Sequence, residues 1–243
     1  MKDKVVKWIK KQVLDAGAKG CVFGLSGGLD SAVVGILCQK AFPDGNLGLL
    51  MPCFSQEEDL KDAQDLAEKF SISTRLVDLK TVCDQFHILL EGKPYDGKAM
   101  NLAIANLKPR LRMITLYYHA NKHNYLVVGT GNRSEAVMGY CTKHGDAGVD
   151  ILPLGGLVKS QVRALAQELK IPAKILNKPP SAGLWPGQTD EGEMGITYDD
   201  LDKIILAMDK KKLAGSDKKL VNKVKQKMAQ TEHKRKSPPV FLP

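Results

Sequence analysis

Apolar residues along this chain occur either in short continuous runs or at helical spacing, and the two patterns alternate. Val6, Ile9 and Val13 recur on one helix face, which predicts an amphipathic helix at the start of the chain. The next apolar run, 21–25, is short and ends at a Gly-rich turn, and helical spacing returns over 32–39. This order predicts a strand, a loop and a helix.

The same order recurs further along the chain. Residues 47–52 form another buried-strand pattern, and Ser55 with Glu58 matches a capping box at the start of a helix that runs to about residue 70. Pro109 is expected to break or kink a later helix. Further strands are predicted at 75–78, 125–129 and 151–154, and further helices at 99–123 and 158–169.

Strands that alternate with helices indicate a parallel sheet covered on both faces. We therefore expect an α/β fold with a doubly wound, five-stranded parallel sheet, formed as a single domain by residues 1–243. Ligands of such sheets bind beyond the carboxyl ends of the strands, where the strand order reverses. The loops after the first and fourth strands are thus the first places to look for chemistry. The Pro- and Gly-rich stretch 177–195 has no periodicity and predicts a long loop.

The net charge of +9 is concentrated near the C-terminus. Residues 210–236 hold eleven Lys or Arg and only two acidic residues, so the remainder of the chain is neutral. Such a segment could bind nucleic acid or a phosphorylated small molecule, or it could be only a solvated, flexible end of the chain. It has no aromatic residues to stack on bases, which favours small phosphates over nucleic acid. Val221, Val224 and Met228 form an apolar stripe, which predicts a helix inside the segment.

Several classes of protein are disfavoured by the sequence. No stretch approaches the roughly 20 apolar residues that cross a bilayer, and the first 17 residues place lysines where a signal peptide would be apolar. The five cysteines include no C-x-x-C pair, which argues against a disulfide framework and a zinc site. We expect a cytoplasmic protein with no membrane partner.

The first loop carries the clearest chemistry. Its adjacent glycines allow backbone N–H groups to face an anion, its serines add hydroxyl groups, and the following helix contributes its positive end. Asp30 would repel a phosphate unless a cation such as Mg²⁺ lies between them. The loop comprises Gly24, Leu25, Ser26, Gly27, Gly28, Leu29, Asp30 and Ser31.

Three other motifs compete with this interpretation. The loop also fits the G-x-S-x-G elbow of a serine hydrolase around Ser26, although no upstream strand and loop would complete its oxyanion hole. Residues 92–98 match a Walker loop, but Ala99 replaces the metal-binding hydroxyl and no strand precedes it. Residues 129–131 begin a dinucleotide fingerprint whose last glycine is replaced by Ser134.

The first loop resembles the pyrophosphate-binding loop of the ATP pyrophosphatases. Downstream motifs resemble those of the NAD synthetases within that superfamily, in the same order and over nearly the whole chain. Ser181 departs from the usual threonine, and Gly183 stands where an acidic residue is common. The matching segments are Asn106 with Arg110, Arg112 and Met113; 128–132 with Glu135; 142–146 with Asp150 and Pro153; Lys159 with 161–163; 180–182; 188–191; and 233–235.

The resemblance implies an adenine nucleotide alpha hydrolase-like fold and an amide-forming ligase. ATP would be the co-substrate, with Mg²⁺ as cofactor. The nicotinate carboxylate of deamido-NAD would attack the α-phosphorus, pyrophosphate would leave, and ammonia would then displace AMP. Ammonia-dependent family members end where this chain ends, which implies free ammonia as the nitrogen donor, and the family is typically homodimeric.

The resemblance also implies roles for individual residues. Asp30 and Glu135 would hold Mg²⁺, while Asp146 would orient ammonia or take its proton. Asp30, Asp146 and Lys159 are the predicted catalytic residues. ATP would contact the loop Gly24–Ser31, Thr130, Lys159 and Ser181, and deamido-NAD would contact Arg110, Lys143, Asp150, His233 and Lys234.

Other functional classes stay open at this point: a tRNA-modifying ATP pyrophosphatase, a serine hydrolase and a non-catalytic nucleotide-binding module. The tRNA-thiolating enzymes generally need reactive cysteines and an RNA-binding extension, and neither is evident in the sequence.

Overall fold

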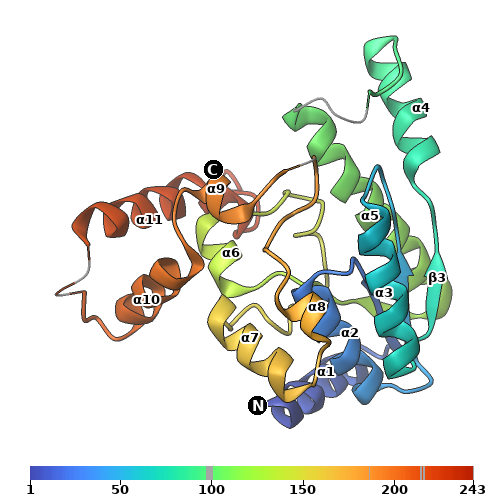
Figure 1. Cartoon of the computed structure of the whole chain (residues 1–243), viewed down its shortest axis with the longest axis horizontal. Helices are drawn as coiled ribbons and strands as arrows, with labels where there is room; N and C mark the ends of the chain where they lie inside the picture. Colours follow the sequence, from blue (N-terminus) through green and yellow to red (C-terminus); the bar gives the residue numbers. More distant parts are fainter. Residues whose placement is uncertain (97–100, 186, 214, 216, 243) are drawn as a thin grey trace.

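The computed structural model describes residues 1–96, 101–185, 187–213, 215 and 217–242. Its centre is a parallel sheet with strand order β3-β2-β1-β4, and helices lie on both faces (Figure 1). The predicted α/β class with a parallel sheet is confirmed. The order reverses between β1 and β4, so the switch point lies at the carboxyl ends of these two strands. The strands are β1 (Gly20–Gly24), β2 (Asn46–Leu50), β3 (Thr74–Leu76) and β4 (Tyr125–Val127).

The predicted fifth strand is reduced to a single bridge. Ile151 pairs in parallel with Val128, and the backbone N–H of Gly129 donates to the Ile151 carbonyl at 2.9 Å. Pro153 has no N–H to continue the ladder, and the chain turns at 152–155. The described residues therefore form a four-stranded sheet, and the prediction of five strands was wrong.

Alternate residues of β1 face two different cores. Cys21 and Phe23 pack in a core beneath α1, α2, α3, α7 and α8, whereas Val22 packs in a second core with α4 and α5. Every one of these three side chains is fully buried, as expected for a strand that is covered on both faces. The helices are α1 (Lys2–Asp15), α2 (Leu29–Ala41), α3 (Glu57–Phe70), α4 (Lys80–Glu91), α5 (Leu102–His123), α7 (Lys159–Glu168) and α8 (Ala173–Leu176).

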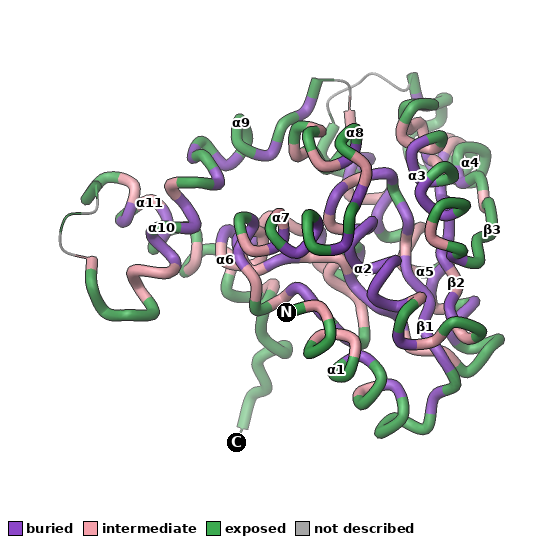
Figure 2. The backbone as a smooth tube through the Cα atoms, turned by 60° about the horizontal axis from the view of Figure 1, so that its bottom comes forward, coloured by how far each residue is buried: buried purple, intermediate pink, exposed green. Residues whose placement is uncertain are grey.

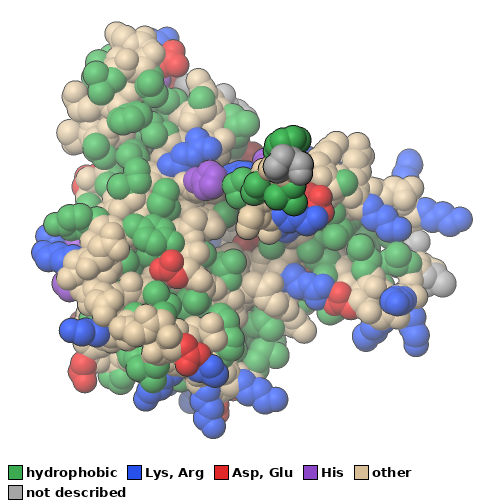
Figure 3. Space-filling view, turned by 180° about the vertical axis from the view of Figure 1, so that it is seen from behind, with side chains coloured by type: hydrophobic (Ala, Val, Ile, Leu, Met, Phe, Trp, Pro, Cys, Tyr) green, Lys and Arg blue, Asp and Glu red, His purple; other side chains and the backbone are tan. Residues whose placement is uncertain are grey.

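The C-terminal helices form an arm that projects from the body (Figure 1). This arm consists of α10 (Tyr198–Asp209) and α11 (Lys218–Gln230), and α6 (Arg133–Met138) and α9 (Asp190–Met194) connect it to the body. It has a small core of its own, visible as buried segments where α10 faces α11 (Figure 2). Lys and Arg side chains gather on its outer surface (Figure 3). The predicted basic segment is thus mainly the solvated side of a helix whose apolar stripe is buried.

Two local predictions were wrong. Ser55 and Glu58 form no capping box, because α3 begins at Glu57 and the Ser55 hydroxyl instead accepts from the Cys53 N–H at 3.2 Å. Pro109 does not break α5, which runs from 102 to 123. Pro109 and its neighbour Lys108 are buried, so packing holds the helix across the lost hydrogen bond.

Three further predictions concern membrane crossing, the cysteines and the Walker-like motif. Across the described part of the chain, no helix combines the length and apolar character that membrane crossing requires. All five cysteines are unpaired. The Walker-like motif includes Gly97 and Lys98, which lie outside the described residues.

Candidate functional site

The first loop lies at the switch point and is held in shape by its own residues. Gly27 has φ +79°, and a Cβ atom there would lie 2.2 Å from the carbonyl oxygen of Asp59 on α3. Only glycine fits this contact. The Ser31 hydroxyl donates to the Gly28 carbonyl at 2.9 Å, and Ser26 Oγ accepts from the Gly28 N–H at 3.3 Å.

These serine contacts bear on the hydrolase alternative. Ser26 Oγ lies 3.0 Å from Ser31 Oγ. Its hydrogen bonds within the described chain go to loop neighbours and not to a histidine, so the general base that a nucleophilic serine needs is missing there.

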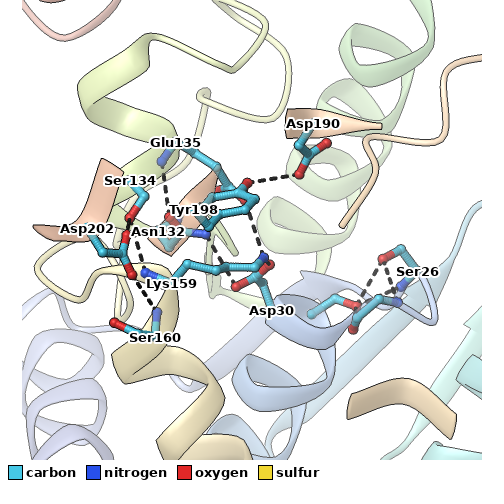
Figure 4. A network of polar contacts seen from close by, with 12 residues as sticks. Ser26, Asp30, Asn132, Ser134, Glu135, Lys159, Ser160, Asp190, Tyr198 and Asp202 are labelled. Carbon is cyan, nitrogen blue, oxygen red and sulfur yellow. Dashed lines mark hydrogen bonds and ion pairs between the residues drawn. The ribbon is translucent and has the colours of Figure 1, made fainter. Parts of the chain in front are cut away.

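Beside this loop, Lys159 joins two acidic residues that are distant in the sequence (Figure 4). Asp30 is on the first turn of α2, and its carboxylate accepts a hydrogen bond from Lys159 Nζ. Glu135 Oε1 lies 3.7 Å from the same ammonium, and the ring of Tyr198 lies 5.2 Å from it. Lys159 is 3% exposed, so this ammonium is shielded from water and depends on its acidic partners. The predicted residues Asp30, Glu135 and Lys159 are therefore brought together.

Glu135 has two functions in this geometry. Its Oε2 accepts from the Asn132 N–H at 3.0 Å and completes a capping box with the Asn132 side chain. Burial and the negative charge of Asp30 raise the pKa of Glu135 from its ordinary 4.5 to about 8, in spite of the nearby Lys159. Its carboxylate lies where an additional positive charge would be stabilising.

Asp190 adds a third carboxylate to the cluster. Its Oδ2 accepts from the Tyr198 hydroxyl at 2.9 Å, and its Oδ1 is buried with no partner among the described residues. Burial raises the pKa of Asp190 above its ordinary value. The cluster thus combines three carboxyl groups with one ammonium and one unsatisfied oxygen.

Asp202 on α10 connects the helices that carry Glu135 and Lys159. Its carboxylate accepts from the Ser134 hydroxyl at 2.5 Å and from the Ser160 N–H at 2.7 Å. Ser134 Oγ in turn accepts from the Lys159 N–H at 3.1 Å. Asp202 is 3% exposed, so it forms a buried link between the first turns of α6 and α7.

Tyr198 and Asp202 were not predicted from the sequence. A signal existed for Asp202, because it falls beside Leu201 and Ile205 on the buried face of α10, where a carboxylate needs partners. Tyr198 gave no comparable signal.

The predicted nucleotide contacts Thr130 and Ser181 lie outside the ion-pair cluster. Thr130 is half-buried in the connection between β4 and α6. Ser181 is exposed, and its hydroxyl accepts from the Gly183 N–H at 3.1 Å.

The residues predicted to bind deamido-NAD are partly engaged with the protein itself. Arg110 lies against the Lys143 carbonyl at 3.4 Å, so these two are neighbours. Asp150 accepts from the Tyr117 hydroxyl at 3.0 Å and from the Val127 N–H at 2.7 Å. Burial, together with the hydrogen bond to Asp150, raises the pKa of Tyr117 to about 12. Asp150 thus supports β4 directly.

The remaining predicted residues lie around the segment 139–146. Lys234 donates to the carbonyls of Gly139 and Cys141 at 2.8 and 2.7 Å, which attaches the C-terminal end to α6. His233 is exposed. Asp146 is solvent-facing, and its Oδ1 accepts from the Thr142 N–H at 2.8 Å.

Comparison with known proteins gives a consistent result. The family described as NAD synthase matches residues 1–238. An NH3-dependent NAD(+) synthetase from Syntrophomonas wolfei is 48% identical over 98% of this chain and 94% of its own. A solved NMN synthetase from Francisella tularensis has a TM-score of 0.89 at 36% identity, covering 99% of this chain and 96% of its own. The NH3-dependent NAD synthetase from Campylobacter jejuni has a TM-score of 0.83 at 28% identity, over 99% and 97%.

Proposed function

Because this chain belongs to the NAD synthase family, we propose that it amidates deamido-NAD with ammonia, using ATP and releasing AMP and pyrophosphate. This would be the last step of NAD formation. The observation that carries the proposal is the convergence of Asp30, Glu135 and Lys159 beside the first loop, at the switch point of a fold shared with these relatives.

The chemistry explains why such a cluster is needed. A carboxylate cannot lose oxide to ammonia near neutral pH, so ATP must first convert it to an acyl adenylate. The nicotinate oxygen bonds to the α-phosphorus as the bond to pyrophosphate breaks, and ammonia then forms the amide as AMP leaves. Charge develops on phosphoryl and acyl oxygens in both steps, so a fixed ammonium such as Lys159 stabilises them. No protein nucleophile takes part.

Mg²⁺ fits the residues that are present. We assign it to Asp30 and Glu135, supported by the raised pKa of Glu135 and by the unpartnered oxygen of Asp190 nearby. Within the described chain, no three His, Cys, Asp or Glu side chains are arranged so that they could hold a metal ion by themselves. A site with only two carboxylates is compatible with Mg²⁺, because this ion is commonly held by one or two carboxylates together with phosphate oxygens and water. Bound there, it would neutralise phosphate charge.

The substrate contacts follow from the same proposal. The first loop, Thr130, Lys159 and Ser181 would contact ATP. Arg110, Lys143, Asp150 and the C-terminal 233–234 would receive the dinucleotide, and Asp150 also accepts a hydrogen bond from β4. Asp146 would orient ammonia.

We also propose that the chain acts as a single domain in the cytoplasm and pairs with a second copy. Ile114 and Tyr118 lie one turn apart on α5 and are 60% and 61% exposed. Large apolar side chains exposed on one helix face are typical of an association surface. Their position on the helix that carries Arg110 would place the second copy near the dinucleotide.

One observation favours a second candidate substrate. The Francisella tularensis relative is an NMN synthetase, and its fold is matched over 99% of this chain. Nicotinate mononucleotide carries the same carboxylate as deamido-NAD, so the same activation chemistry applies. The two substrates differ in the adenylate half, which only the dinucleotide would place near the basic C-terminal end.

The test is a side-by-side assay of purified protein. With ATP, Mg²⁺ and ammonium, we expect NAD, AMP and pyrophosphate in equal amounts from deamido-NAD, and a much lower kcat/KM for nicotinate mononucleotide. A higher kcat/KM for the mononucleotide would assign the second candidate. Release of ADP and phosphate would reject the adenylate mechanism. Equal turnover with glutamine in place of ammonium would reject the assignment of free ammonia as the nitrogen donor.

A further inference from the structure

Lys108 is a buried cation that the proposed chemistry does not use. It lies on α5 and is 1% exposed. Its Nζ donates to the carbonyl of Leu184 at 2.8 Å and lies 5.1 Å and 5.5 Å from the ring centroids of Tyr95 and Phe54. The two rings meet edge to face at 4.9 Å. An ammonium buried at this depth is unfavourable unless it is held by such partners, and burial lowers the pKa of Lys108.

The partner carbonyl belongs to the segment between α8 and α9, which carries Ser181 and ends at Asp190. Figure 1 shows this segment rising from α8 toward the N-terminal half of α5 and returning to α9. It is attached to the site at both ends. Lys178 binds Asp59 and lies 3.4 Å from the carbonyl of Gly27 in the first loop, and Asp190 joins the carboxylate cluster.

Between these ends, the contact with Lys108 joins the segment to the body of the protein. Leu184 also donates its N–H to Gln188 Oε1 at 2.7 Å, and Gln188 Nε2 donates to Glu193 at 2.9 Å. These bonds connect Leu184 through Gln188 to Glu193 on α9. Displacing the Leu184 carbonyl would therefore disturb this hydrogen-bonded connection.

We propose that Lys108 is a positioning residue that fixes the segment 179–185 over the ATP site, with the rings of Phe54 and Tyr95 orienting its ammonium. The effect of Lys108 on ATP binding rests on the proposed function, whereas its contact with the segment does not. A purely structural buried lysine would instead support α5, and its loss would lower stability without changing the segment locally.

Trp185 allows these alternatives to be separated. It is half-buried next to Leu184, and Trp8 is the other tryptophan of the chain. In a Trp8→Phe background, acrylamide quenching therefore reports on the segment alone, without any substrate. Lys108→Met keeps the apolar stem and removes the ammonium. Lys69→Met is the matched control, because Lys69 lies 5.5 Å from the Phe70 ring on the exposed side of α3.

We expect Lys108→Met to raise the quenching constant of Trp185 at least about twofold and the KM for ATP about tenfold, a change typical of losing one hydrogen bond from a charged group. The kcat should change much less. Lys108→Arg should restore part of both effects, since it restores the charge, and Lys69→Met should change neither.

Unchanged quenching in a folded Lys108→Met protein would overturn the inference. If that protein does not fold, Phe54→Leu replaces it, because this change removes one ring and leaves the lysine; normal quenching there would equally overturn it. Raised quenching with a normal KM for ATP would reject the role at the nucleotide. If the wild-type protein itself makes no NAD, the proposed function is rejected. Raised quenching in Lys108→Met would then still support the role of Lys108 in fixing the segment.

Discussion

Glu135 illustrates how one side chain combines a structural and a chemical role. Its Oε2 completes the cap of α6, while its Oε1 faces Lys159. Substitutions can separate these roles, because glutamine keeps an acceptor for the Asn132 N–H and removes the charge.

We expect Glu135→Gln to lower kcat at least about a hundredfold, as for the loss of a principal electrostatic contact in a transition state. Its melting temperature should stay equal or rise, because burial and Asp30 already disfavour the charged form of Glu135 and the amide is neutral. Glu135→Ala should lower activity similarly and also destabilise the fold by about 1 kcal/mol through the lost cap. Steady-state kinetics and thermal unfolding check both variants. Normal turnover by the glutamine variant would mean that Glu135 is only a cap.

At the residue scale, Asp30, Glu135 and Lys159 were predicted from the sequence, whereas Asp202, which holds two of them in place, was not. Asp30 could be inferred from the loop itself, because a carboxylate beside a phosphate site implies a cation. Glu135 and Lys159 were placed only by the order of family motifs, since they are 24 residues apart in the sequence and come together through Asp202 on a distant helix. That link depends on tertiary packing, which no local pattern encodes.

Among the elements, α3 and α8 are joined by a buried carboxylate. Asp62 lies 2.7 Å from the ammonium groups of both Lys174 and Lys178. Burial alone would raise the pKa of Asp62, but the two ammonium groups outweigh it and hold this pKa below its ordinary 3.8. The folded state therefore binds this proton less tightly than the unfolded state. The contribution to stability is present above about pH 4 and is lost as the pH falls through the lowered pKa.

We expect Asp62→Asn to reduce the free energy of unfolding by about 1–3 kcal/mol at pH 7, and by progressively less toward pH 3. The matched control is Asp65→Asn, whose exposed pair with Lys61 at 3.0 Å should contribute at most about 0.5 kcal/mol. Urea unfolding at pH 7, 5 and 3 measures both. If the loss in free energy of unfolding does not depend on pH, or is equal in Asp65→Asn, the buried Asp62 carboxylate does not stabilise the fold as described.

Elements with strong periodicity were predictable, and those defined by single contacts were not. The opening helix, β1, β2 and the stripe of α11 matched the structure because burial sets their apolar pattern. β3 was also predicted, although all three of its residues are exposed. The fifth strand failed because Pro153 lacks the N–H that would extend the pairing. The short helices α6, α8 and α9 span six residues or fewer, too few for a periodic signal.

For the whole molecule, the exposed pair on α5 predicts how the chain associates. We expect Ile114→Lys to convert a dimer to a monomer in sedimentation velocity. Leu14→Lys on α1 is the matched control, because Leu14 is 57% exposed and lies on a different helix. A wild-type monomer, or a dimer that survives Ile114→Lys, would exclude this surface as the interface.

The separate core of the projecting arm divides the molecule into regions of unequal protection. The α10 and α11 helices are held by a small cluster that includes Leu201, Ile205 and Val224, whereas α2 is enclosed by the main core. Amide hydrogens of α11 should therefore exchange with deuterium through local opening, well before those of α2 exchange through global unfolding. Because Asp202 ties α10 to the first turns of α6 and α7, those turns should share the faster exchange of the arm. Glu135 and Lys159, two of the three residues that converge beside the first loop, would then lie at the boundary between a rapidly opening region and a persistent one.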